Sequence, residues 1–307
     1  MFKNLSLYRL PSPWNISLET VEEQLKKAPF VHCAGTEVQR SGWVSPTGKP
    51  EAPFVHAVNR QWIITLCTEQ RILPSSVIND ELKERAAAIE EQQGYRLGRK
   101  AMRDLKTVIA EELMPRAFTR RRLVNVWIDP VNGWLGIDTP SIAKGEEVIE
   151  ILRKSIDNLP LSTVKTQVSP SAAMSDWLAG GHAPEGFTID RDCELKAPGD
   201  ERATVRYVRH ALDGEGVDSE IKAHIGRGKI PTRLALTWDD RLSFVLTDRF
   251  EIKRLSMLDI VKEEVEQTIE SEDERFDADF VLMTGELSRF LPQLLASLGG
   301  EVAAEDK

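Results

Sequence analysis

The amino-acid sequence predicts an α+β fold with mixed or antiparallel sheets and a projecting helical hairpin. Most strand-like segments come in pairs joined by short turns, which disfavours a doubly wound parallel sheet. One long helical region is interrupted by two glycines, so we expect it to fold back on itself. The chain has 307 residues, more than one hydrophobic core usually serves, so we also expect two or three packed units.

The first elements of the chain are a strand and a short helix. Residues 2–10 read as a strand, and residues 17–27 as an amphipathic helix with Ser17 as its N-cap. A proline-containing loop follows, and the β-branched and aromatic residues of 61–68 then predict a second strand. Helices and strands therefore alternate irregularly from the start, as in an α+β fold.

The longest helical region covers residues 77–114, where apolar residues recur at helical spacing. Gly94 and Gly98 interrupt this pattern and predict the turn of a helical hairpin. The second helix should end at Met114, because a residue that precedes a proline leaves the α region.

A β-hairpin and a helix should follow. Residues 123–129 and 134–138 read as two strands, and Asn132-Gly133 between them supplies the positive φ of a tight turn. Residues 144–156 then have the pattern of a helix.

The C-terminal part combines further strands and helices around a second hairpin. The expected elements are a strand at 203–210, a helix at 218–225, hairpin strands at 231–238 and 241–247 joined by Asp239-Asp240, a helix at 257–271, a strand at 278–283 and a helix at 286–298.

The order of elements and the prolines near residue 165 divide the chain into three expected units. We expect a central α+β domain formed by residues 1–75 together with 115–165, a helical tip at 76–114, and a C-terminal α+β base domain at 166–307 with an acidic end.

Charge is distributed unevenly, although the net charge of the chain is −9. Residues 257–307 contain 14 acidic and 4 basic residues, so this segment alone carries −10. The rest of the chain sums to +1. The acidic average therefore does not exclude a nucleic-acid partner, and it indicates one surface that attracts anions and another that repels them.

The most basic segment is 96–122, with nine basic and three acidic residues and a charge of +6. Arg99, Arg103 and Lys106 follow helical spacing and should share one face of the second helix, well separated from its apolar face. A second stretch, 222–233, has four basic residues and no acidic one. Both segments are candidate anion-binding surfaces, although many runs of charge are simply solvated.

The residues after the second helix are the most suggestive of nucleic-acid binding. Phe118 stands among four arginines, which are Arg116, Arg120, Arg121 and Arg122. Arginine pairs bidentately with phosphate and stacks on bases, and an exposed phenylalanine can stack on a base or wedge into a duplex. The alternative is that Phe118 anchors a core and the arginines are solvated.

Signals for catalysis or a bound metal are weak, and we expect no cofactor. The three cysteines fit no zinc spacing, and the five histidines show no paired ligand spacing. Two carboxylate pairs, Asp277 with Asp279 and Asp239 with Asp240, could hold Mg²⁺ as in a nuclease. A magnesium-dependent nuclease therefore stays open as an alternative.

Short segments spread over nearly the whole chain match one known family. They are Phe-Lys-Asn-Leu at 2–5, Tyr-Arg-Leu at 8–10, Gly-Trp-Val at 42–44, Ile-Leu-Pro at 72–74, Pro-Arg-Ala-Phe at 115–118, Trp-Ile-Asp at 127–129, Val-Asn-Gly at 131–133, Leu-Arg-Lys-Ser at 152–155, Leu-Ala-Leu at 234–236, and the pair 275–280 and 282–287. On these collinear matches the chain resembles the recombination-associated protein RdgC family of proteobacteria.

The resemblance implies a protein that is not an enzyme. It would form a ring-shaped homodimer that encircles double-stranded DNA without sequence specificity, also binds single-stranded DNA, and inhibits RecA-dependent recombination and strand exchange. Phe118 would lie at the tip of the ring, and the acidic C-terminal unit would lie on its outside. Arg209 and Lys229 would take basic positions of the family, with His210 beside Arg209.

The expected DNA-binding residues are basic, aromatic or polar and come from three regions of the chain. They are Arg96, Arg99, Lys100, Arg103, Lys106, Arg116, Phe118, Arg120, Arg121, Arg209, His210, Lys229 and Arg233. No apolar run approaches the ~20 residues of a membrane span, and no secretory signal is visible. We therefore expect a cytoplasmic, nucleoid-associated protein with no membrane partner.

A further alternative is a protein–protein interaction module of the replication or recombination machinery. Its acidic helix at 257–271 would bind a basic partner.

Overall fold

The computed structural model describes residues 2–199, 203–212, 216–263 and 272–302. Its strands are β1 (Leu5–Arg9), β2 (Gln39–Val44), β3 (His56–Val58), β4 (Gln61–Ile72), β5 (Phe118–Asp129), β6 (Trp134–Ile137), β7 (Ser162–Thr163), β8 (Phe187–Lys196), β9 (Thr204–Tyr207), β10 (Ile230–Trp238), β11 (Leu242–Thr247) and β12 (Glu251–Met257). Its helices are α1 (Leu18–Leu25), α2 (Ser75–Gln93), α3 (Arg99–Leu113), the 3₁₀ turn η1 (Met114–Arg116), α4 (Ile142–Ser155), α5 (Pro170–Gly180), α6 (Val217–Gly226), α7 (Asp259–Glu263) and α8 (Glu272–Ser297).

All these strands belong to one antiparallel sheet that runs through the described part of the chain. Its order is β2-β4-β5-β6-β1-β12-β11-β10-β8-β9, with β3 paired to β4 and β7 paired to β1. The N-terminal strand joins the two halves, because β1 pairs with β6 on one side and with β12 on the other. The predicted α+β class with antiparallel sheets is therefore confirmed.

Helices cover the two faces of this sheet in different places. Val21 and Leu25 of α1 and Val148 and Leu152 of α4 pack against alternate residues of β4, β5 and β6. The opposite face carries a larger core, in which α5, α6 and α8 pack on the strands of the C-terminal half. We call these two surfaces the α4 face and the α8 face.

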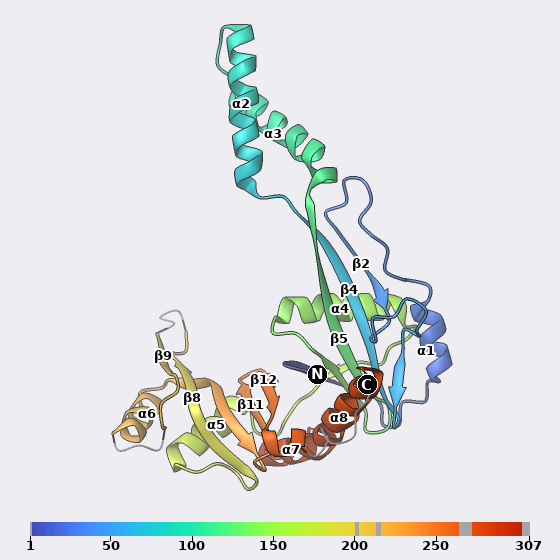
Figure 1. Cartoon of the computed structure of the whole chain (residues 1–307). Coiled ribbons are helices and arrows are strands. Elements are labelled where there is room, and N and C mark those ends of the chain that lie inside the picture. Colours follow the sequence, from blue (N-terminus) through green and yellow to red (C-terminus); the bar gives the residue numbers. More distant parts are fainter. Residues whose placement is uncertain (1, 200–202, 213–215, 264–271, 303–307) are drawn as a thin grey trace.

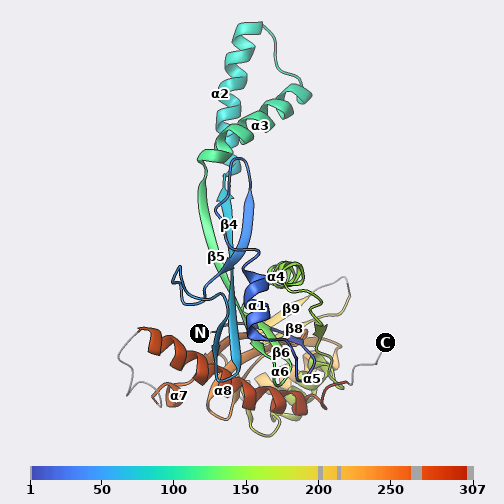
Figure 2. The ribbon, with the colours of Figure 1, turned by 90° about the vertical axis from the view of Figure 1, so that its right-hand side faces the viewer.

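Strands β4 and β5 extend well beyond the core and form a long ribbon that ends at the helical hairpin α2–α3 (Figure 1). The strands from β8 to β12 form a base at the other end, so that ribbon and base make the two arms of an L (Figure 1). Seen from the side, the ribbon and the hairpin rise as a narrow column above the base (Figure 2). This shape presents the exposed half of β5 far from the main core.

Features set by local sequence were predicted correctly. The Ser17 hydroxyl accepts a hydrogen bond from the backbone N–H of Thr20, as an N-cap does. Gly94 ends α2 in the left-handed conformation at φ 79°, which a glycine adopts without strain. Asp239 and Asp240, both at positive φ, form the tight turn between β10 and β11.

The expected strand at 278–283 is wrong, because these residues lie inside α8. Phe280, Met283 and Leu287 recur at helical spacing and are all buried. A continuous apolar run does not by itself distinguish a buried strand from a buried helix. The expected helix at 257–271 is also corrected, since Met257 ends β12 and the described helix is α7; residues 264–271 lie outside the described part.

Other differences concern element boundaries. Strand β5 begins at Phe118 rather than at residue 123, and β4 continues to Ile72. The basic residues of this segment therefore lie on a strand rather than in a loop. Helix α5 and strand β8 were not anticipated from the sequence.

Candidate nucleic-acid interface

The exposed half of β5 carries Phe118, Arg120 and Arg122 on the α4 face. Side chains alternate along a strand, and Val124, which follows in the same series, is buried in the core that α1 and α4 cover. All residues from Phe118 to Leu123 are exposed. The sequence therefore changes, on one face of one strand, from core residues to a row of one aromatic and two basic side chains.

Arg120 and Arg122 line a small hollow between the ribbon and α4, with a volume of about 90 Å³. Thr68 and Gln70 of β4 and Lys144 and Glu147 of α4 also line it. The Lys144 ammonium pairs with Glu147 at 2.6 Å, whereas Arg120 and Arg122 have no carboxylate partner among the described residues. Two unpaired guanidinium groups beside polar side chains make this hollow suited to phosphate oxygens.

Phe118 has 87% of its surface exposed. Its backbone pairs with that of Ile72 at the end of β4, which is also exposed. The alternative in which Phe118 anchors a core is therefore excluded, and its ring is available for stacking against a ligand.

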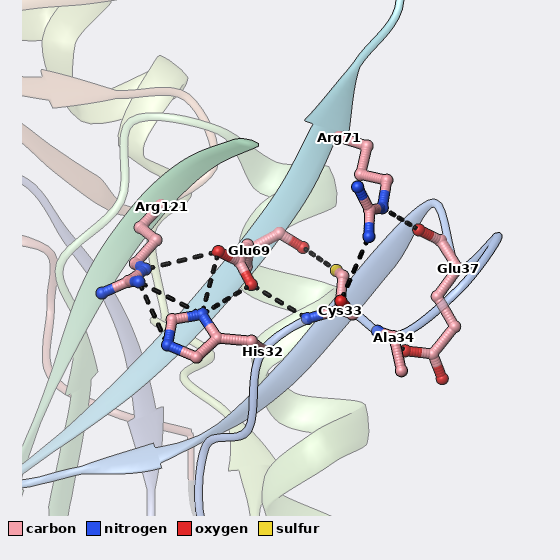
Figure 3. A network of polar contacts seen from close by, with 7 residues as sticks. All are labelled: His32, Cys33, Ala34, Glu37, Glu69, Arg71 and Arg121. Carbon is pink, nitrogen blue, oxygen red and sulfur yellow. Dashed lines mark hydrogen bonds and ion pairs between the residues drawn. The ribbon is translucent and has the colours of Figure 1, made fainter. Parts of the chain in front are cut away.

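Arg121 points to the α8 face, where it takes part in a network centred on Glu69 (Figure 3). Arg121 Nε lies 3.4 Å from Glu69 Oε1, and a second guanidinium nitrogen lies 3.1 Å from His32 Nδ1. The Glu69 carboxylate also lies 3.2 Å from His32 Nδ1 and accepts a hydrogen bond of 2.9 Å from the Cys33 backbone N–H. Arg121 is thus engaged within the protein, unlike its two neighbours.

The side chain of Glu69 is 3% exposed, so its charge has to be balanced by these donors. The hydrogen bond from the Cys33 N–H is the largest cause that lowers its pKa, followed by those from His32 and Arg121. Together they outweigh burial, which acts in the opposite direction, and bring the pKa to about 2. Glu69 is therefore ionised at neutral pH and holds the loop around Cys33 to the ribbon.

Arg71 binds the same loop at Cys33 and Glu37 (Figure 3) and also reaches the base of the helical hairpin. Its guanidinium donates to the carbonyl oxygens of Met114 at 3.1 Å, Pro115 at 3.0 Å, Cys33 at 3.2 Å and Glu37 at 3.2 Å. These bonds fix η1, and with it the point at which Phe118 enters the ribbon. Sequence analysis did not single out Arg71, because an isolated arginine in a strand carries no local signal.

The helical hairpin presents Arg99, Arg103 and Lys106 on exposed positions of α3, as predicted. Two of them also lie beside apolar side chains of neighbouring elements. Arg103 and Lys106 border a groove of about 470 Å³ that also contains Ile78 and Val38. Lys106 Nζ in addition donates to Asn79 Oδ1 of α2 at 2.8 Å. Arg96, Lys100 and Arg116 are exposed nearby, in the loop before α3, on α3 and in η1.

The remaining predicted residues lie on the base, at the other end of the ribbon (Figure 1). Arg209 and His210 follow β9, Lys229 precedes β10, and Arg233 is exposed on β10. The His210 backbone N–H donates to Arg191 O, and its Nδ1 lies 3.0 Å from Ala211 O. The structure therefore places the candidates in two groups, one on the ribbon and hairpin and one on the base.

The two proposed carboxylate pairs lie on different elements, one inside α8 and one in the turn between β10 and β11. Asp277 and Asp279 lie two positions apart on a helix, so their side chains do not face each other. Asp277 Oδ1 instead lies 2.7 Å from His56 Nε2 of β3. In the part of the chain that the structure describes, no group of three or more His, Cys, Asp or Glu residues could hold a metal ion.

Comparison with known proteins gives a consistent result over nearly the whole length. The family model described as "Putative exonuclease, RdgC" matches residues 1–301. The chain is 61% identical to the recombination-associated protein RdgC of Dechloromonas aromatica over 301 residues, which is 98% of each chain. It is 50% identical to the proteins of the same name from Janthinobacterium sp. (strain Marseille) and Herminiimonas arsenicoxydans, again over 98% of this chain and 98% and 99% of theirs. Among the described residues, no helix is both long and apolar enough to span a membrane.

Proposed function

The chain belongs to the RdgC family of recombination-associated proteins, and from that premise we propose that it binds DNA without reading its sequence. The observation that supports this best is the row of Phe118, Arg120 and Arg122 on the α4 face. All three are exposed, and neither arginine is neutralised by a carboxylate of the described residues. Guanidinium groups on a rigid strand can pair with phosphates, which every DNA sequence presents alike.

We expect the protein to bind DNA electrostatically and to bind double-stranded as well as single-stranded DNA. Phosphate contacts release counterions, so affinity falls steeply as salt increases. The Phe118 ring adds a stacking surface that is tolerant of sequence. The second group of basic residues, on the base, would contact the same DNA where it passes the other arm of the L.

The proposal includes a homodimer that closes around the duplex as a ring. One chain forms only an open L (Figure 1), and a second copy that meets the free ends of both arms would enclose a hole. Such a ring would antagonise RecA by occupying DNA in the nucleoid. Sedimentation equilibrium tests the dimer, and a protein trapped on closed circular DNA but released from linear DNA at high salt would support encirclement.

A salt series of gel shifts tests DNA binding itself. With roughly 6–10 phosphate contacts, affinity for a random duplex should fall by about 10³–10⁵ between 50 and 200 mM salt. Two duplexes of unrelated sequence should give the same curve within error. Absence of binding, or binding that does not respond to salt, would contradict the proposal.

We further propose that binding is not accompanied by strand cleavage, although the matching family model is described as an exonuclease. The described carboxylates offer no cluster for a catalytic metal. Labelled linear and circular DNA incubated with protein and Mg²⁺ or Mn²⁺ should remain full length. Shortened products that disappear on addition of a chelator would show that the protein is an enzyme.

A further inference from the structure

The base contains a hollow of about 520 Å³, and one of the predicted DNA-binding residues, Arg209, is among those that line it. It is lined by Ala235 of β10 and by Ser243 and Val245 of β11. Its lining also includes three basic side chains, Arg191, Arg209 and Arg254, and two acidic ones, Asp190 and Asp192. We infer from two residues of β12 that this hollow lies on the α4 face. Glu251 lies opposite Ser6 of β1, and Lys253 Nζ donates to the carbonyl oxygen of Pro140, just before α4.

Both strands that flank β10 and β11 are irregular at this point. In β8, the pairing shifts from Cys193 opposite Leu234 to Ile189 opposite Leu236, which leaves residues 190–192 opposite Ala235. In β12, the pairing with β11 shifts between Ser243 and Val245, beside Arg254. Bulges redirect side chains and are common next to functional sites. Here they bring Asp192 and Arg254 to the same hollow.

Two arginines of the hollow have a costly backbone conformation. Arg209 has φ 55° and Arg254 has φ 51°, in the left-handed region that favours glycine. Such outliers persist only where the surrounding structure holds them, and they cluster at ligand sites. One carboxylate holds both: Asp192 accepts 2.8 Å hydrogen bonds from the Arg209 backbone N–H and from the Arg254 guanidinium.

The charges of this region leave basic groups available for a ligand. Asp190 accepts a hydrogen bond from the Thr237 hydroxyl, and Asp192 accepts hydrogen bonds from Arg209 and Arg254. The N–H of Arg209 is the largest cause that lowers the pKa of Asp192, so this carboxylate stays ionised at neutral pH. Arg191, Arg209 and Arg233 have no carboxylate partner among the described residues, and the Arg254 side chain is 65% exposed.

We propose that Arg254 and Arg209, held by Asp192, form a phosphate-binding site for the DNA backbone on the base. Asp192 acts here as a positioning residue, and Arg254 is a binding residue that sequence analysis missed. This inference rests on the proposed DNA-binding function, and it adds a specific contact on the arm of the L opposite to the ribbon.

The variant Arg254→Gly separates binding from folding, because glycine suits the positive φ at this position. The thermal melting temperature should stay equal or rise. At about 100 mM salt, loss of one phosphate contact should weaken affinity for a random duplex about five- to tenfold. The magnitude of the slope of log affinity against log salt concentration should fall by about 1. Fluorescence anisotropy with a labelled random duplex measures both quantities.

Arg60→Gly is a matched control. Arg60 is exposed, has φ 65° and lies in the turn between β3 and β4, so this change removes the same charge and the same backbone strain elsewhere. Its affinity and salt slope should equal those of the wild type. If Arg254→Gly binds as well as Arg60→Gly, the phosphate site is refuted while DNA binding stands. If the wild type itself does not bind, the proposed function fails first.

Asp192→Asn tests the positioning role. A carboxylate that merely lies near DNA would repel it, so its removal would tighten binding. If Asp192 instead positions Arg209 and Arg254, Asp192→Asn should lower the affinity for DNA and reduce the salt slope. Unchanged or tighter binding would overturn the positioning role of Asp192.

Discussion

Neighbouring residues of one strand lie in opposite environments in this protein. Arg120 and Arg122 face the α4 side and have no carboxylate partner in the described part of the chain, whereas Arg121, between them, pairs with the buried Glu69. The sequence shows three consecutive arginines and offers no means of telling them apart. Their environments depend on the register of β4 against β5, which places Glu69 opposite Arg121. A test of DNA contacts therefore has to use Arg120 and Arg122 and leave Arg121 intact.

Phe118→Ala should leave the stability of the protein almost unchanged. The side chain is 87% exposed, so we expect a change of less than about 0.5 kcal/mol in the free energy of unfolding. DNA affinity should fall because a stacking surface is lost. Urea unfolding and a gel shift on the same preparation measure the two effects.

Phe290→Ala provides the contrast, since this ring is fully buried in the main core. It should destabilise the protein by about 3–5 kcal/mol. A loss of that size in Phe118→Ala would show that Phe118 supports the fold.

Glu69 should make stability depend on acidity. Its pKa lies at about 2 in the folded protein, below the ordinary value of 4.5. The stabilisation is therefore fully present above about pH 4.5 and is lost as the pH falls toward 2. Urea unfolding across this pH range should show that the free energy of unfolding decreases less for Glu69→Gln than for the wild type.

The exposed Glu150, whose ion pair in the described part of the chain is with Lys154 on α4, serves as the control for that comparison. Glu150→Gln should follow the wild-type curve closely, because exposed ion pairs contribute little. Identical curves for Glu69→Gln and wild type would contradict the stabilising role of the network.

At the scale of elements, the helical hairpin α2–α3 is held by few buried side chains. Ile109 is fully buried and Ala86 nearly so, and Arg85 bridges the helices by its ion pair with Glu112 at 2.6 Å. We propose that residues 76–114 form a unit that can open separately from the sheet.

Ile109→Ala should loosen this unit by about 2–5 kcal/mol. Hydrogen exchange should become faster in α2 and α3 and stay unchanged in β10 and β11. Val108→Ala, at an exposed neighbouring position, should leave the exchange of both helices as it is. Faster exchange throughout the sheet would show that the hairpin does not open separately.

Elements were predictable where their signal is local. Glycines and turn residues located the helical hairpin and both β-hairpins, and Ser17 located the start of α1. The apolar run at 280–283 was misread because helix and strand both bury such residues, and only the packing of α8 on the sheet decides between them. Lys144 and Arg254 could not be anticipated, since tertiary structure alone brings them beside the other arginines.

At the scale of the whole molecule, the sheet separates regions of different charge. The described acidic residues Glu274, Asp277 and Asp279 lie on α8, on the face of the sheet opposite to Arg120 and Arg122. A net charge of −9 is thus compatible with DNA binding on the α4 face. The acidic side should favour solubility and disfavour DNA contacts away from that face.

The central claim is that DNA is bound through the α4 face. The most direct measurement compares the affinity of wild type, Arg120→Gln/Arg122→Gln and a control with equal charge loss, Arg60→Gln/Arg289→Gln, for a random duplex over a range of salt. Arg60 and Arg289 lie in the β3–β4 turn and on α8. We predict that the first double variant lowers the log–log salt slope by about 2 and that the control matches the wild type. Equal slopes for both double variants would contradict the account.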